Sequence, residues 1–242
     1  AYGIRVGPDE KIYVADWNRI TRIDPVLGTV EVWLDPGGQF SPKVLDFSVD
    51  LTKMYVGSIS QGGNVYVIDL QTLEIKTSAA TGSRAVRTLA VLPGARIIFG
   101  TEEGIVFETN SDLDILTPIL DRDSVVLRLG ISESGRLVAV CRGDGITEIL
   151  NAETWEIVHR LRENKGGVWE AMFDEVNGVV HTVGTDDSIR TFDLVSGEQT
   201  NMIGSSQGYV WSGALSEDRR FVWSGGHDGT VKKWRVGDTA IR

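Results

Sequence analysis

The side chains best suited to acid–base chemistry are the three histidines, and one of them, His227, directly precedes Asp228. A histidine beside a carboxylate is a candidate general base. This pair, however, stands in the segment SGGHDGT between two strand-like runs, where Asp and Gly are the residues that build tight turns. We therefore interpret Asp228 and Gly229 as a structural corner and His227 as a contact residue beside it.

The other reactive side chains do not combine into a recognisable site. His159, His181 and Cys141 are scattered, without the spacing of zinc ligands. We expect His181, inside the apolar run VVHTV, to be a hydrogen-bonded core residue, and Cys141 to be a small buried hydrophobe. The sequence therefore predicts no catalytic residue, no metal site and no cofactor.

The overall composition restricts the classes of partner. The chain has 242 residues, of which 41% are hydrophobic, and its 24 basic and 34 acidic side chains give a formal charge of −10. An acidic protein repels phosphate backbones, so we expect no nucleic-acid partner. No apolar run approaches the roughly 20 residues that a membrane helix needs, so we expect no membrane partner. A single cysteine fits a reducing, intracellular and cytoplasmic location.

The positions of the strand-like segments show an internal repeat. A landmark residue that ends the third strand-like run of each copy recurs at intervals of 45, 41, 41, 42 and 42 residues. Each copy contains short alternating apolar runs separated by Gly, Asp, Asn and Ser, a pattern typical of antiparallel strands. The six landmarks are Asp24, Asp69, Asn110, Asn151, Asp193 and Arg235.

Four short strands in each of six copies predict an all-β fold, a β-propeller of about six four-stranded antiparallel blades. We expect a single domain over residues 1–242, with blades at about 1–37, 38–80, 81–122, 123–163, 164–205 and 206–242. Copy one begins at its innermost strand, and copy six ends where a short fourth strand, DTAIR, would form. Two alternatives stay open: six blades that close by face packing, or six blades of a seven-bladed ring.

The last copy carries a family resemblance. The segment HDGTVKKW at residues 227–234 resembles the third-strand signature of the WD-repeat family, and GDG, EEG and TDDS match the same turn less well. The segment GPDEKIYVADWNRI at residues 7–20 is more similar to NHL-type or gluconolactonase-like propellers. The Gly-His pair that precedes the first strand of WD repeats is missing from every copy. We therefore do not expect the buried hydrogen-bond network that this His forms.

Two functions follow from these resemblances, and the bare termini lead us to expect a third. The WD-repeat resemblance implies a non-catalytic scaffold that binds a protein or peptide on the propeller rim. The first blade implies an alternative, a metal-dependent hydrolase or lyase in which Asp16 and Asn18 mimic part of the ligand set. A third alternative is a structural module of a larger multidomain protein, or a subunit of a larger complex.

Alignment of the copies places candidate contact residues on the rim, and the pairs VWEAM and VWSGA put Trp169 and Trp211 in the same register. Because Trp, Tyr and Arg are enriched at interface hot spots, we predict one aromatic docking patch with Lys43 and Arg87 forming an anion-tolerant opposite side. The patch consists of Trp169, Tyr209, Trp211 and His227. The alternative is that the two tryptophans fill gaps between blades. The first strands contribute Tyr2, Lys43, Arg87, Leu127, Trp169 and Trp211, with Tyr209 beside them, and the turns contribute Asp16, Trp17, Glu102, Arg142, Thr185 and His227.

Overall fold

The computed structural model describes residues 3–59, 62–77, 81–162 and 165–236. These residues form strands β1 to β23 and no helix. The strands make six antiparallel sheets, five with four strands and a last one in which three strands are described. The fold is therefore all-β and of the six-bladed β-propeller class, as predicted. The expected fourth strand of the last blade, DTAIR, lies outside the described residues.

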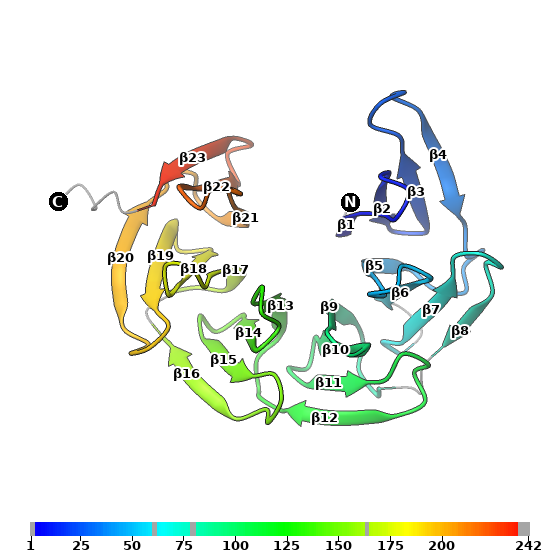
Figure 1. Cartoon of the computed structure of the whole chain (residues 1–242), viewed down its shortest axis with the longest axis horizontal. Helices are drawn as coiled ribbons and strands as arrows, with labels where there is room; N and C mark the ends of the chain where they lie inside the picture. The colour runs from blue at the N-terminus through cyan, green and yellow to red at the C-terminus, as the bar shows by residue number, and fades with distance from the viewer. Residues whose placement is uncertain (1–2, 60–61, 78–80, 163–164, 237–242) are drawn as a thin grey trace. The chain divides into compact units, whose positions relative to one another are not determined.

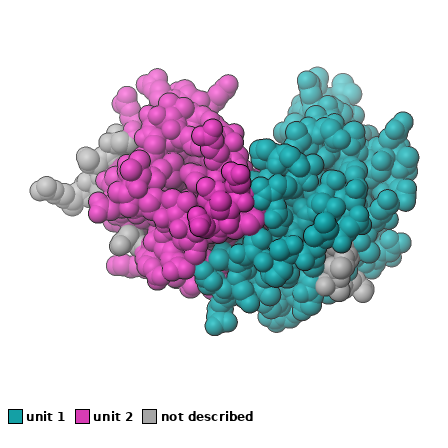
Figure 2. All heavy atoms as spheres, turned by 60° about the horizontal axis from the view of Figure 1, so that its bottom comes forward, with its two compact units in different colours: residues 1–123 teal, residues 124–242 magenta. Residues whose placement is uncertain are grey.

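The chain divides into two compact units, residues 1–123 and 124–242 (Figure 2), and each unit contains three sheets. We call the sheets blades 1 to 6 in chain order. In the first unit, blade 1 has β1 (Gly3–Val6), β2 (Ile12–Asp16), β3 (Arg19–Ile23) and β4 (Val30–Leu34). Blade 2 has β5 (Pro42–Phe47), β6 (Lys53–Ser58), β7 (Val65–Asp69) and β8 (Ile75–Thr77), and blade 3 has β9 (Val86–Leu92), β10 (Arg96–Thr101), β11 (Val106–Thr109) and β12 (Leu116–Leu120).

The second unit repeats this arrangement. Blade 4 has β13 (Val126–Ile131), β14 (Leu137–Arg142), β15 (Thr147–Asn151) and β16 (Ile157–Leu161). Blade 5 has β17 (Val168–Asp174), β18 (Val179–Gly184), β19 (Ser188–Asp193) and β20 (Gln199–Gly204). Blade 6 has β21 (Val210–Leu215), β22 (Phe221–Gly226) and β23 (Val231–Arg235).

The core of each unit lies between its blades. In Figure 1 the first strands of successive blades lie side by side, β1 with β5 and β5 with β9 in one unit, β13 with β17 and β17 with β21 in the other. The second strands β6, β10, β14 and β18 are buried along almost their whole length. A strand whose side chains are buried on both faces favours apolar residues, which is why these runs are largely apolar.

The Asp and Asn landmark residues, five of the six, cap the turn after the third strand of their blade. The Asp24 carboxylate accepts hydrogen bonds from the backbone N–H groups of Val26 and Leu27, both at 2.9 Å. Asn151 accepts equivalent bonds at 2.8 and 3.1 Å, and Asp193 at 2.9 and 2.7 Å. An Asp or Asn side chain that satisfies the backbone two or three residues on fixes this turn, so its type recurs in the sequence.

The structure differs from the sequence-based expectation at the start of blade 6, where a buried hydrogen-bond network does form. Trp234 Nε1 donates to Ser224 Oγ at 2.7 Å, and Ser224 Oγ donates to the side-chain oxygen of Gln207. The Gln207 amide nitrogen then donates to the backbone carbonyl of Thr230 at 2.9 Å. A Gln before the first strand has both a donor and an acceptor, so the network needs no His at this position.

Candidate functional site

Five of the predicted rim residues share one structural feature, a β-bulge in the first strand of their blade. In blade 5, Val168 pairs with Gly184 and Glu170 pairs with Val183, so Trp169 is the extra residue between them. Blade 6 has the same irregularity at Trp211, between Val210 and Ser212. Equivalent bulges occur at Lys43, Arg87 and Leu127.

A bulge changes the direction of the side chain that it carries. The extra residue has no partner across the ladder, so its side chain leaves the in–out alternation of the strand. In the second unit the bulge residues are all apolar, Leu127, Trp169 and Trp211, whereas in the first unit Lys43 and Arg87 are cationic. The sixth candidate of this series, Tyr2, lies outside the described residues.

The four predicted patch residues of the second unit do come together in the structure. The rings of Trp169 and Trp211 are 5.1 Å apart and meet edge to face at 79°, and those of Tyr209 and Trp211 are 5.4 Å apart at 82°. His227 lies 5.8 Å from the Tyr209 ring and 6.1 Å from the Trp211 ring. We call Trp169, Tyr209, Trp211 and His227 the aromatic cluster.

The backbone holds the aromatic cluster at the corner between β22 and β23. The His227 N–H donates to the carbonyl of Tyr209 at 2.8 Å, which fixes the turn beside the start of β21. Asp228 accepts hydrogen bonds from the Thr230 N–H at 2.9 Å and hydroxyl at 2.8 Å. These bonds lower the pKa of Asp228, while Gly229 has a φ of 77°. Asp228 and Gly229 therefore build the corner, as predicted.

The aromatic cluster is partly a packing unit and partly an open surface. Tyr209 and Trp211 are 49% and 40% exposed, and His227 is also exposed. Trp169 is half-buried, and its indole N–H is buried with no hydrogen-bond partner among the described residues. The gap-filling alternative thus describes Trp169, whereas Tyr209 and Trp211 can contact another molecule.

The cationic bulge residues Lys43 and Arg87 belong to the first unit, so we describe them apart from the aromatic cluster. They lie on β5 and β9, two strands in contact, and both are half-buried. Burial and the charge of Arg87 lower the pKa of Lys43 to about 8, against a weaker opposite effect of Glu102. The surroundings of Lys43 therefore disfavour its charged form, and a nearby anionic group would stabilise that form.

The remaining rim candidates differ in their exposure to solvent. Trp17 is exposed in the turn between β2 and β3, where its backbone N–H donates to Asp16 at 2.9 Å. Arg142 is buried and unavailable, because its Nε donates to Glu148 at 3.1 Å and an Nη donates to the Ser124 carbonyl at 3.0 Å. Its placement on the rim was wrong, because a turn position in the alignment does not reveal an internal carboxylate partner.

The other residues with reactive side chains have structural surroundings. His181 is buried and bonded to Thr191 Oγ1 at 2.9 Å, and burial lowers its pKa. Cys141 is fully buried, which raises its pKa to about 12 and makes the thiolate inaccessible. Within the described part of the chain, no group of three His, Cys, Asp or Glu side chains could hold a metal ion.

The segment GSSQG at residues 204–208 has the spacing of the nucleophile elbow of serine hydrolases. That motif requires a strand before the serine and a helix after it, so that the hydroxyl stands exposed at a sharp turn. Here the segment joins β20 to β21, so the element that follows the serine is a strand and not a helix. Ser206 has a φ of 50°, and its carbonyl accepts a bond from Lys232 at 2.9 Å. The match is therefore one of spacing alone.

The fold and the site define a β-propeller whose second unit carries a partly exposed aromatic cluster. No protein-family model and no curated protein matches the sequence. Among solved structures, the chain is similar to the crystal structure of the computationally designed Ika8 protein, with a TM-score of 0.78 and 20% sequence identity, over 97% of this chain and 70% of that one. This likeness shows a shared fold and carries no information on function. Among the described residues, no helix is long and apolar enough to cross a membrane.

Proposed function

We propose that this chain is a non-catalytic interaction module that binds a protein or peptide through the aromatic cluster. The observation that carries this proposal is the set of four rings in mutual contact on one corner, with two of them at least two-fifths exposed. Rings already packed edge to face lose little conformational entropy on binding, and Trp and Tyr are the residue types that dominate interface energetics.

The surroundings of the aromatic cluster favour an apolar peptide contact. Leu127, the bulge residue of blade 4, lies against the backbone of Gly167, where an added Cβ would come within 3.0 Å of Leu127 Cδ1. Gly167 in turn lies two residues before Trp169. Leu127 thus lies beside the backbone segment that leads into Trp169 within the second unit. The WD-repeat resemblance of blade 6 supports the same role, because that family implies binding on the rim.

The test is a comparison of peptide affinities between two tryptophan variants. Peptides are selected from a random display library on the wild type, and their Kd values are measured by fluorescence polarisation. We expect Trp169→Ala with Trp211→Ala to weaken binding at least about thirtyfold, the loss of a hot spot of about 2 kcal/mol. Circular dichroism must show that this variant keeps the wild-type fold.

The matched control is Trp223→Ala, since Trp223 is 41% exposed in the same unit and lies outside the aromatic cluster. It should bind the selected peptides like the wild type. Equal losses in both variants, or full affinity in the double variant, contradict the proposal. If the double variant unfolds, Tyr209→Ser removes a ring of the cluster that is 49% exposed and gives the same test.

A further inference from the structure

The bulges of β5 and β9 bring two cationic side chains together within the first unit. Gly57 of β6 pairs with Val44, the residue after Lys43. A Cβ added at Gly57 would lie 2.6 Å from Val86 Cγ1 and 2.7 Å from Val44 Cγ1, so the two valines meet over this glycine. Val86 directly precedes the bulge at Arg87. Close packing beside both bulges thus keeps Lys43 near Arg87, and the charge of Arg87 acts on it. We call Lys43 and Arg87 the cationic pair.

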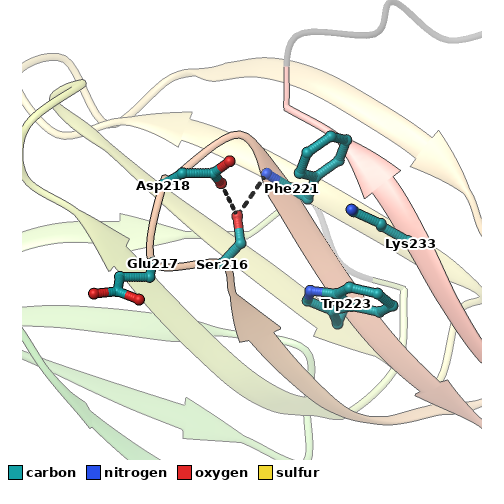
Figure 3. Close-up of a pocket in the computed structure, with 6 residues that line it drawn as sticks. All are labelled: Ser216, Glu217, Asp218, Phe221, Trp223 and Lys233. Carbon is teal, nitrogen blue, oxygen red and sulfur yellow. Dashed lines mark hydrogen bonds between the residues drawn. The ribbon is translucent and has the colours of Figure 1, made fainter.

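The Arg87 guanidinium lacks the kind of partner that other cations of this chain have. Figure 3 shows a hollow in blade 6 where Lys233 is compensated by two aromatic rings. Its Nζ lies 3.8 Å from the centroid of the Phe221 ring and 5.1 Å from that of Trp223. Arg87 is half-buried, yet among the described residues its guanidinium makes no hydrogen bond and no ion pair. Its donors are therefore available to a ligand.

One carboxylate, that of Glu102, acts on the cationic pair, and a further arginine shares it. The Glu102 N–H donates to the Ala85 carbonyl at 3.0 Å, which holds the β10–β11 turn beside the start of β9. Its carboxylate lies 3.7 Å from an Nη of Arg84, whose Nε also pairs with Glu103 at 3.3 Å. With the cationic pair, this group holds three positive and two negative side chains, so one positive charge is in excess.

We propose that the cationic pair binds the carboxylate group of a ligand. A guanidinium presents parallel N–H donors that match the two oxygens of a carboxylate, and the neighbouring ammonium adds a further donor. One excess positive charge is complementary to one negative charge. A dianion would bring its second charge against Glu102. The carboxylate also stabilises the charged form of Lys43, which burial and Arg87 disfavour.

The cationic pair lies in the first unit and shares no residue with the aromatic cluster. Carboxylate binding therefore goes beyond the proposed function, and it stands or fails separately from peptide binding by the aromatic cluster. A carboxylate can come from a small organic acid or from a peptide. Both sources offer the same chemical group to Lys43 and Arg87, so the affinities of two probes distinguish them.

The test is a titration of the protein with sodium acetate at pH 7, at constant ionic strength set with sodium chloride. The NMR chemical shift of the Lys43 Cε carbon reports binding. We expect a saturable change in the wild type and a Kd at least about tenfold higher in Arg87→Gln, the loss of a charge-assisted hydrogen bond. Arg19→Gln, at an exposed arginine of the same unit, is the matched control and should bind acetate like the wild type.

A pH titration of the wild type gives a second readout. Because acetate binds the charged lysine, saturating acetate should raise the pKa of Lys43 above its value in chloride. The affinity for acetate should fall once the pH exceeds about 8, where Lys43 without ligand loses its proton. Lys76 is exposed and should titrate identically in both salts.

A third variant tests the charge balance and keeps the proposal falsifiable if Arg87→Gln misfolds. Glu102→Gln removes the carboxylate that opposes a second negative charge. The affinity for sulfate relative to acetate should therefore rise at least about tenfold in this variant, since about 1.4 kcal/mol corresponds to a factor of ten. An unchanged ratio of the two affinities contradicts the proposal.

The source of the carboxylate is assigned with acetyl-tetraalanine and its C-terminal amide. Tighter binding of the peptide acid than of acetate indicates a peptide carboxylate, and equal affinities indicate a small organic acid. The amide should leave the Lys43 signal unchanged. The proposal is overturned if Lys43 titrates identically in acetate and chloride, if Arg87→Gln keeps the wild-type Kd, or if the wild type prefers sulfate to acetate.

Discussion

The charged form of Lys43, a bulge residue, lowers the free energy of unfolding of the protein. Burial is the main cause that lowers its pKa to about 8 from an ordinary 10.5, and the charge of Arg87 is the second. At pH 7 the folded protein holds this lysine charged in a disfavouring place, whereas the unfolded chain hydrates it. Between about pH 8 and 10.5 the unfolded lysine is protonated and the folded one is not, so this residue makes stability rise with pH there.

Replacement of Lys43 by methionine should therefore stabilise the protein at pH 7. We expect a gain of roughly 1 kcal/mol in the free energy of unfolding, a value reduced for solvent screening because the side chain is only half-buried. The gain should vanish above about pH 10.5, where the wild-type lysine is neutral in both states. Urea unfolding at both pH values measures it. Lys76→Met, at an exposed lysine, is the control, and a Lys43→Met variant that is less stable at pH 7 contradicts the argument.

Residue types alone predicted part of the site. The shared register of VWEAM and VWSGA was enough to place Trp169 beside Trp211, and the turn chemistry of HDG identified the corner at Asp228. The role of Gln207 was not predicted, because the WD-repeat resemblance implies a His at the position before the first strand. A polar residue that can both donate and accept, placed just before a buried strand, is the signal that would have found it.

At the scale of elements, the start of each first strand decides where the rim side chains point. An added Cβ at Gly184, the last residue of β18, would lie 2.5 Å from the carbonyl oxygen of Gly167. Backbone atoms cannot move aside as a flexible side chain can. Gly167 precedes the bulge at Trp169 by two residues, so Gly184 allows the close approach that the bulge and the aromatic cluster depend on.

Gly184→Ala should therefore destabilise the protein and disturb the aromatic cluster together. We expect a loss of about 2 kcal/mol in the free energy of unfolding, typical of overpacking, and a change in near-UV circular dichroism. Gly204→Ala in β20 is the matched control, because an added Cβ there meets no atom within 4 Å. That variant should stay within about 0.5 kcal/mol of the wild type. Equal stability of the two variants would show that the Gly184 backbone can shift freely.

The strands could be predicted from the sequence, whereas the bulges could not. Alternation and turn residues are local signals, and each strand-like run within the described residues corresponds to a strand of the structure. A bulge is a property of two paired strands, since it is visible only when two residues face one. The alignment placed Lys43, Trp169 and Trp211 at equivalent positions, but only the pairing shows why these side chains leave the alternation.

At the scale of the whole molecule, the number of blades followed from the landmark residues, because five of the six cap a turn and the sixth, Arg235, ends β23. The exposure of one face of blade 1 had no such signal. The alternation in β1, with Ile4 and Val6 on one side, looks the same in sequence whether that side is covered or open. The division of the chain into two units after residue 123 could not be predicted either, because the segment there resembles the other connections between blades. Whether one face of a sheet is buried depends on the sheets beside it, and a local sequence pattern does not encode those neighbours.

The net charge of the whole molecule argues for a peptide partner over a polyanion. With 34 acidic and 24 basic side chains, the protein should repel phosphate backbones, and electrostatic binding of nucleic acid is strongest at low salt. We therefore expect no change in the fluorescence anisotropy of labelled random single-stranded or double-stranded oligonucleotides at low salt, at protein concentrations that saturate a selected peptide. Binding that weakens as salt rises would contradict this expectation. Loss of that binding in a Lys43→Met, Arg87→Met variant would then place it at the cationic bulge residues and not at the aromatic cluster.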